Sequence, residues 1–161
     1  MEGFCLVGAT VDYSKGLKEL FEESGCTPAR GFALGRIEEA PESVQSAQPR
    51  IGFVSAGRQM PDGELRSYLK FTFGVRPATV RETLKLLALR WGMIGGICGS
   101  VAALGSSVAS NGIETGPNHR FIAAFLRGTD TPWMLDAILH SNASIWVGGW
   151  YFAVAQDQPW P

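Results

Sequence analysis

The chain has 161 residues, of which 45% are hydrophobic and 18% are charged, and its formal net charge is −1. This length supports one domain with a hydrophobic core, but not two of ordinary size. The low charged fraction and the 11% of aromatic residues exclude an intrinsically disordered chain.

The N-terminal third predicts short elements joined by irregular chain. Residues 3–8 and 50–55 are short apolar runs typical of strands, and residues 14–24 predict a helix that ends at Gly25. Residues 27–50 hold three prolines and no sustained hydrophobic period. We therefore expect an extended arm or a long surface connection over 27–50, within a single domain that spans the chain.

The central segment predicts two helices. Asp62 is placed to cap the first helix, which ends where Arg76-Pro77 interrupts the pattern. Thr79 and Glu82 have the spacing of a capping box for the second helix, and apolar residues then recur at helical spacing. This second helix is the element that the sequence predicts most clearly.

The second half of the chain also predicts helices. They are a helix of small residues over 96–110, a helix capped by Asn118, and a helix opened by Thr131-Pro132. Gly148-Gly149 lies between strand-forming residues and indicates a C-terminal β-hairpin, with a buried helix as the alternative. The sequence therefore predicts a mainly α fold, a compact helical domain with minor short β-strands or a C-terminal β-hairpin.

The small net charge hides an uneven distribution. Residues 1–57 carry a net charge of −3, residues 58–127 carry +5, and residues 128–161 carry −3. Arginine outnumbers lysine ten to four, and its guanidinium forms bidentate contacts with phosphate. The candidate nucleic-acid-binding residues are the central cations Arg66, Lys70, Arg76, Arg81, Lys85 and Arg90.

Two pairs of these cations have the spacing of one helical turn. Arg66 precedes Lys70 by four residues, and Arg81 precedes Lys85 by four. With aromatic residues interleaved, they predict a groove for the phosphate backbone of RNA or DNA. Two alternatives stay open: a solvated helix face, or a basic surface that pairs with the acidic arm of a neighbouring copy.

A catalytic interpretation centres on Cys98. This residue begins a predicted helix, and a helix N-terminus favours a reactive thiolate. His119 and His140 are candidate bases, which Asp136 or Asp157 would orient. Together they would make a small thiol-dependent hydrolase or transferase. The simpler interpretation of Cys98 is a small buried residue.

Other functional classes find little support in the sequence. Three scattered cysteines and two histidines do not predict a zinc site, and no glycine-rich loop predicts a phosphate-binding cofactor site, so we expect no metal or cofactor. Residues 91–113 lack Asp, Glu, Lys and Arg, which makes a membrane-associated component the third hypothesis, although the many glycines and serines oppose it. The first residues do not resemble a signal peptide, and we expect a location in the cytoplasm or within a viral or cellular assembly.

The sequence-based prediction is thus a non-enzymatic assembly subunit, similar in organisation to coat or nucleocapsid proteins or to a scaffold. It would form a homo-oligomer or filament and bind RNA or DNA through its arginine-rich centre. The aromatic tail that contains Trp160 is a candidate docking segment for a partner.

Overall fold

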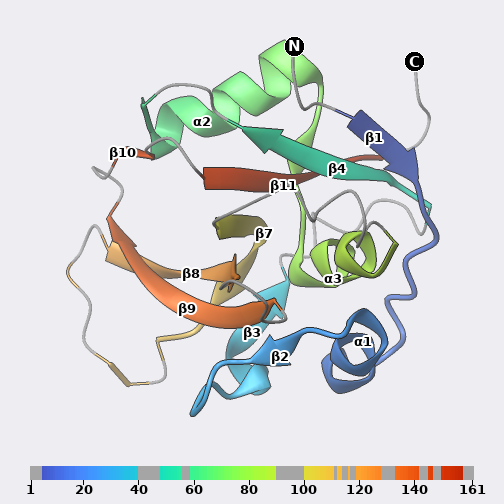
Figure 1. The fold of residues 1–161 in the computed structure, drawn as a ribbon. Coiled ribbons are helices and arrows are strands. Elements are labelled where there is room, and N and C mark those ends of the chain that lie inside the picture. The colour runs from blue at the N-terminus through green and yellow to red at the C-terminus, as the bar shows by residue number, and fades with distance from the viewer. Residues whose placement is uncertain are drawn as a thin grey trace.

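A mixed β-sheet organises the chain (Figure 1). The computed structural model describes residues 5–39, 48–55, 59–89, 100–110, 112–113, 116, 119–127, 133–141, 145–146 and 150–157. The long strands of the sheet are β4 (Arg50–Ser55), β7 (Ser100–Val108), β8 (His119–Leu126), β9 (Met134–Ser141) and β11 (Trp150–Gln156). Short strands β1 (Cys5–Gly8) and β2 (Thr27–Pro28) lie at its two ends, in the order β1-β4-β11-β7-β8-β9-β2.

Neighbouring strands along this path are antiparallel, except for the parallel pairs β7–β11 and β2–β9. Two further short strands extend the sheet, because β3 (Ile37–Glu39) pairs with β7 and β6 (Arg76–Pro77) pairs with β11. A separate two-stranded sheet joins β5 (Met60–Pro61) to β10 (Ile145–Trp146). Segments far apart in sequence therefore meet throughout the fold.

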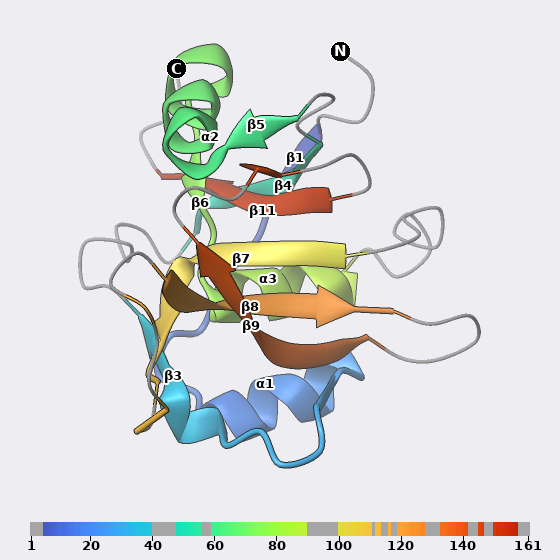
Figure 2. The ribbon, with the colours of Figure 1, turned by 90° about the vertical axis from the view of Figure 1, so that its left-hand side faces the viewer.

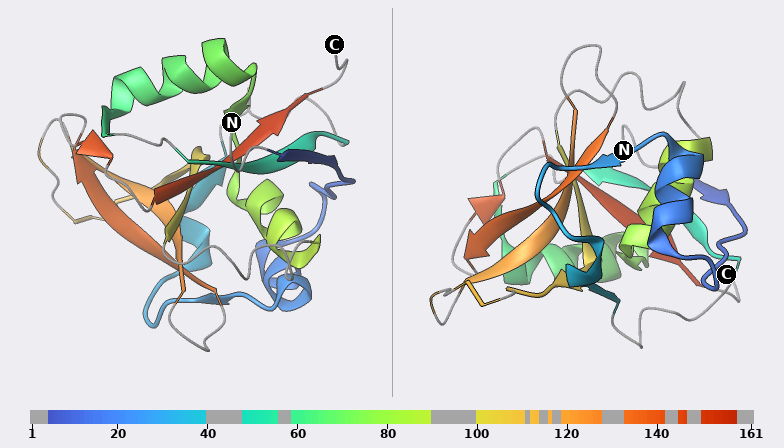
Figure 3. Two further views of the ribbon diagram at one scale, coloured as in Figure 1. Left: turned by 45° about the horizontal axis from the view of Figure 1, so that its top comes forward. Right: turned by 90° about the horizontal axis from the view of Figure 1, so that it is seen from below.

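Helices cover both faces of the sheet (Figures 1, 2 and 3). On one face lie α1 (Leu17–Ser24) and α3 (Val80–Leu89), and a short 3-10 helix, η1 (Leu34–Arg36), precedes β3. On the other face lies α2 (Asp62–Tyr68), which continues directly into a π-helical turn, η3 (Leu69–Phe73).

Two hydrophobic cores result, one on each side of the sheet. Along β7, Val101 and Ala103 pack into the core that contains the apolar residues of α3, whereas Ala102 and Leu104 pack into the core that contains Leu65 of α2. This alternation follows from the strand geometry, since successive side chains point to opposite faces. The two helices therefore present their outer surfaces on opposite sides of the molecule.

The predicted mainly α fold is wrong, because the fold is mainly β. Residues 100–108 form β7 rather than a helix, and the segments expected to be helices after Asn118 and Thr131 contain β8 and β9. In β7, Val101, Ala102 and Ala103 are all 0% exposed. A strand buried on both faces lacks the polar alternation that identifies a strand locally, so small apolar residues in a row can be mistaken for a helix.

The C-terminal hairpin is wrong in its pairing. Strands do form on both sides of Gly148-Gly149, which lies outside the described residues, but β10 pairs with β5, and β11 pairs with β4 and β7. Within the predicted arm, residues 27–39 lie on the sheet through β2 and β3, and Arg50 at its end begins β4. Residues 40–47 of that arm lie outside the described residues.

Predictions that depend on local chemistry were confirmed for the helices α1 and α3. Helix α1 ends at Gly25, whose φ of 74° is left-handed. At the start of α3, the Thr79 amide donates to Glu82 Oε1 at 2.9 Å and the Glu82 amide donates to Thr79 Oγ1 at 3.2 Å, which is a capping box. The predicted cap Asp62 is wrong in detail, because it is the first residue of α2 and makes no capping bond.

Candidate functional site

The predicted basic residues divide between two regions of the molecule. Arg66 and Lys70, called the α2 pair below, lie on the α2–η3 helix, and Arg76 lies in β6. Arg81 and Lys85, the α3 pair, lie on the helix that covers the other face of the sheet (Figure 1). Arg90 lies outside the described residues. The structure therefore brings three of the six together and separates the α3 pair from them.

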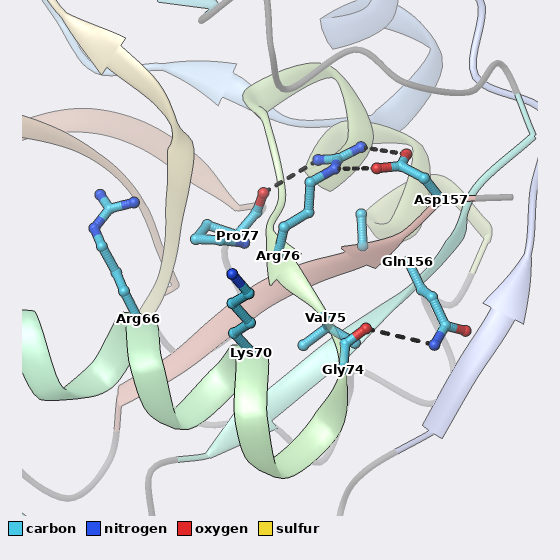
Figure 4. Close-up of a pocket in the computed structure, with 9 residues that line it drawn as sticks. Arg66, Lys70, Gly74, Val75, Arg76, Pro77, Gln156 and Asp157 are labelled. Atoms are coloured by element: carbon cyan, nitrogen blue, oxygen red, sulfur yellow. Dashed lines mark hydrogen bonds and ion pairs between the residues drawn. The ribbon is translucent and has the colours of Figure 1, made fainter. Parts of the chain in front are cut away.

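The α2 pair and Arg76 line one pocket of about 600 Å³. One side of the pocket is the α2–η3 helix, and the other sides are residues 74–77 and residues 155–157 at the end of β11. Figure 4 shows Arg66 and Lys70 projecting from the same side of the helix. The volume is in the range of sites that bind small ligands or one unit of a larger ligand.

The α2 pair is exposed and has few partners. Within the described parts of the chain, the Lys70 side chain makes no ion pair or hydrogen bond, and its Nζ lies 5.5 Å from the ring centroid of Phe71. One Arg66 nitrogen donates to the backbone oxygen of Leu104 at a long 3.5 Å. Although Arg66 is exposed as a whole, its guanidinium is partly desolvated, which lowers its pKa; repulsion from Arg120 lowers the pKa further, and Asp62 opposes both effects. Both side chains keep most of their donor capacity for a ligand.

The guanidinium of Arg76, in contrast, already has carboxylate partners for its hydrogen-bond donors. Its guanidinium forms a bidentate pair with Asp157, at 2.7 and 2.9 Å, and a second bidentate pair with Glu82, at 2.8 and 2.7 Å. Burial lowers the pKa of Arg76, but the hydrogen bonds and charges of these two carboxylates outweigh burial and raise it overall. Arg76 therefore builds the pocket wall and is not available for a phosphate.

Glu82 connects that wall to the opposite face of the sheet. Its side chain is 0% exposed and also accepts a 2.8 Å hydrogen bond from the hydroxyl of Tyr13. Burial raises the pKa of Tyr13, and the neighbouring Glu82 charge raises it further. The capping residue of α3 is thus also the centre of an ionic network, a role that the capping-box pattern does not reveal.

Two glycines shape the pocket. Gly74 ends the π-helical turn with a φ of 66°, so the chain reverses into β6 beside the α2 pair. Gly105 of β7 lies against the backbone after β6, where an added Cβ would come within 2.6 Å of the Pro77 oxygen. Only glycine allows that close approach, which fixes the wall of the pocket against the sheet.

The pocket combines two cations with an apolar wall formed by Val75, Pro77 and Ala155. Comparisons with protein-family models, curated proteins and solved structures found no match. Guanidinium and ammonium groups bind phosphate oxygens, and apolar walls accept a flat ring or a sugar. The pocket therefore suits a ligand that carries a phosphate together with a ring or a sugar.

The predicted catalytic residues do not assemble among the described residues. Cys98 lies outside them. In the antiparallel pair of β8 and β9, His119 lies opposite Ser141, and the next pair is Arg120 opposite His140. Adjacent pairs point to opposite faces of a sheet, so the side chains of His119 and His140 lie on opposite faces. Asp157 binds Arg76, and Asp136 accepts a bond from the amide of Ala137. The thiol hypothesis stays a prediction.

A second polar cluster surrounds Asp62 at the start of α2. Its Oδ2 accepts a 3.0 Å bond from Arg120, and its Oδ1 accepts a 3.1 Å bond from Trp146 Nε1. His140 stacks on Trp146 with ring centroids 4.3 Å apart, and its Nε2 is 3.6 Å from Asp62 Oδ1, too far for a hydrogen bond. Burial lowers the pKa of His140 and outweighs the nearby carboxylate of Asp62. The cluster holds α2 against β8, β9 and β10.

A metal site and a membrane-spanning helix are the other two features that the sequence raised. No group of three His, Cys, Asp or Glu side chains in the described parts of the chain could hold a metal ion. No helix within those parts has the length and apolar character needed to cross a membrane. Of the stretch 91–113, residues 100–108 form β7.

Sequence reasoning missed the pocket itself. Asp157 binds Arg76 and Gln156 Nε2 lies 3.5 Å from the Gly74 oxygen, so both residues meet the segment after the α2–η3 helix from more than 80 positions away. No local pattern marks either residue. The sequence marks Arg76-Pro77 as a helix breaker and Arg76 as a candidate phosphate-binding cation, whereas the two residues form β6 and one wall of the pocket.

Proposed function

We propose that the protein binds the phosphate backbone of nucleic acid, without catalysis, through Arg66 and Lys70. The observation that carries this proposal is the pair of exposed cations, one helical turn apart, that face one pocket and make no ion pair among the described residues. Phosphate oxygens are the natural acceptors for this donor set.

The pocket wall supports the same role. Because Glu82 and Asp157 hold Arg76 rigidly, the wall does not need to rearrange when a ligand enters. The carboxylate of Asp157 is occupied by Arg76, which limits its repulsion of an incoming phosphate. The available positive charge therefore lies on the helix side of the pocket.

Replacing the α2 pair tests the proposal, and the α3 pair supplies a matched control. The variant R66A/K70A should lose at least about tenfold in affinity for a labelled oligonucleotide, since each lost bond to a charged group is worth about 1.5–3 kcal/mol. The variant R81A/K85A removes the same charge at the same spacing from the other face and should bind as the wild type does.

Fluorescence anisotropy at several salt concentrations is the measurement. Two phosphate contacts on a single strand predict a slope of log K against log salt of about −1.4, which should approach zero in R66A/K70A. Equal losses in the two double variants would show that only net charge matters. Unchanged binding by R66A/K70A would overturn the proposal.

Self-assembly stays a prediction. The exposed large apolar side chains among the described residues are Phe71, Leu89, Ile113, Met134 and Leu139, which are scattered over several elements. Scattered residues of this kind are normal on a monomer. Size-exclusion chromatography with light scattering tests assembly directly, and a strict monomer at high concentration would contradict it.

A further inference from the structure

Phe71 is the most exposed large apolar residue in the described parts of the chain. It is 79% exposed and lies in the π-helical turn directly after Lys70. Phe73, two residues later, is partly buried and packs edge-to-face on Tyr68 with ring centroids 5.2 Å apart. One turn therefore buries one phenylalanine and leaves the other in solvent beside the cation of the pocket.

The π-helical turn explains this exposure. An extra residue per turn changes the direction of the side chains that follow, and such turns occur often at functional sites. Leu69 at its start is 0% exposed and anchors the turn to the core, and Gly74 closes it. The Phe71 ring is thus presented from a fixed backbone, and the Lys70 ammonium lies 5.5 Å from its centroid.

The number of available cations restricts the partner. Each phosphate contact adds to affinity through counterion release, and a protein with strong backbone affinity for a duplex makes several of them, for example about six to ten. The pocket offers two such cations, because Arg76 is held by carboxylates and the α3 pair lies on the other face. Two contacts alone bind weakly, so a partner must add a contact that is not electrostatic.

An unpaired base provides that contact. Aromatic side chains beside a cationic groove stack on the bases of single strands, whereas a duplex keeps its base faces inside the helix. We propose, on the basis of the proposed function, that the partner is a single-stranded nucleic acid with successive phosphates at Arg66 and Lys70 and one base stacked on Phe71.

Three probes and two variants separate this partner from the alternatives. The probes are a fluorescein-labelled thymidine 12-mer, its duplex with a complementary strand, and an abasic 12-mer with the same phosphates. The variant F71A removes the ring, and L89A removes an exposed leucine of α3 as a control. The variant F71W should keep or strengthen stacking.

The 12-mer should bind more tightly than the duplex and the abasic strand. F71A should weaken binding of the 12-mer by roughly five- to 150-fold, with little change in the salt slope, and should leave binding of the abasic strand as it was. L89A should have no effect, and F71W should retain wild-type affinity.

Several results would overturn the inference. If the duplex binds as tightly as the 12-mer, or if F71A binds the 12-mer as the wild type does, no base stacks on Phe71. If thymidine monophosphate binds as tightly as the 12-mer, the occupant is a free nucleotide. If F71A has no effect while R66A/K70A loses affinity, only the single-strand inference fails. If R66A/K70A has no effect, the proposed function itself fails.

Discussion

The α2 pair and the α3 pair have the same residue types and the same spacing, but their surroundings differ. The α2 pair faces a pocket whose carboxylate, Asp157, is bound by Arg76. On the other face, the pocket between α1 and α3 is lined by Glu22 and Glu23, and Arg81 of the α3 pair donates to the backbone oxygen of Lys15. Local spacing brings two cations together, and the neighbouring elements decide whether an anion can approach them.

The ionic network around Arg76 joins these two regions, and we expect its loss to have the largest effect. In E82A the guanidinium loses one of its two carboxylates and α3 loses its capping bond. Breaking a buried ion pair costs about 3–5 kcal/mol, and the remaining bond to Asp157 places E82A near the lower end. Urea unfolding measures this loss.

Two milder variants distinguish the contribution of the Glu82 charge from that of the Tyr13 hydrogen bond. E82Q keeps an acceptor for the Thr79 amide but removes the charge, so it should lose less stability than E82A. Y13F removes one hydrogen bond and should lose about 1 kcal/mol. An E82A protein as stable as the wild type would show that the network does not hold the pocket wall.

The two regions also differ in how well their sequence predicts them. The capping box at Thr79 and Glu82 and the stop at Gly25 depend on neighbours within four residues, so their patterns identified them. The strands β7, β8 and β9 depend on partners that are distant in sequence, and β7 and β8 are buried on both faces where they cross the core. Their apolar runs therefore fitted a helix as well as a strand.

In the candidate site too, the features set by near neighbours were predictable and those set by distant partners were not. The spacing of Arg66 and Lys70 correctly indicated that they share a helix face, because α2 and η3 form a continuous helix. Glu82 and Asp157 can both bind the guanidinium of Arg76 because β6 lies beside β11, and no local pattern encodes that pairing. For the same reason, the sequence could not show that a sheet separates the α3 pair from the pocket.

A change of pH should alter the stability of the α2 region through His140. The folded pKa of His140 lies below the ordinary value of 6.5 because of burial, so the unfolded chain binds a proton more readily. Stability contributed by neutral His140 is present above 6.5 and is lost as the pH falls from there to the folded pKa. The slope cannot exceed about 1.4 kcal/mol per pH unit for one group.

Unfolding by urea between pH 5 and pH 8 measures this slope in the wild type and in H140Q. The glutamine variant lacks the titrating group and should lose the His140 contribution over that window. The pKa values of Tyr13 and Arg76 are both raised and lie above the window, so Y13F should keep the wild-type pH dependence. An H140Q protein with an unchanged slope would place the titration elsewhere.

The smallest expected effect is that of F71A on stability. Phe71 is 79% exposed and buries little apolar surface, so its removal should change the free energy of unfolding by less than about 0.5 kcal/mol. The variant F73A in the same turn should lose clearly more, because Phe73 packs on Tyr68 and the core beneath α2. Urea midpoints of the two variants give the comparison. If F71A is as destabilised as F73A, Phe71 stabilises the turn, and a loss of nucleic-acid binding in F71A could no longer be assigned to a stacked base.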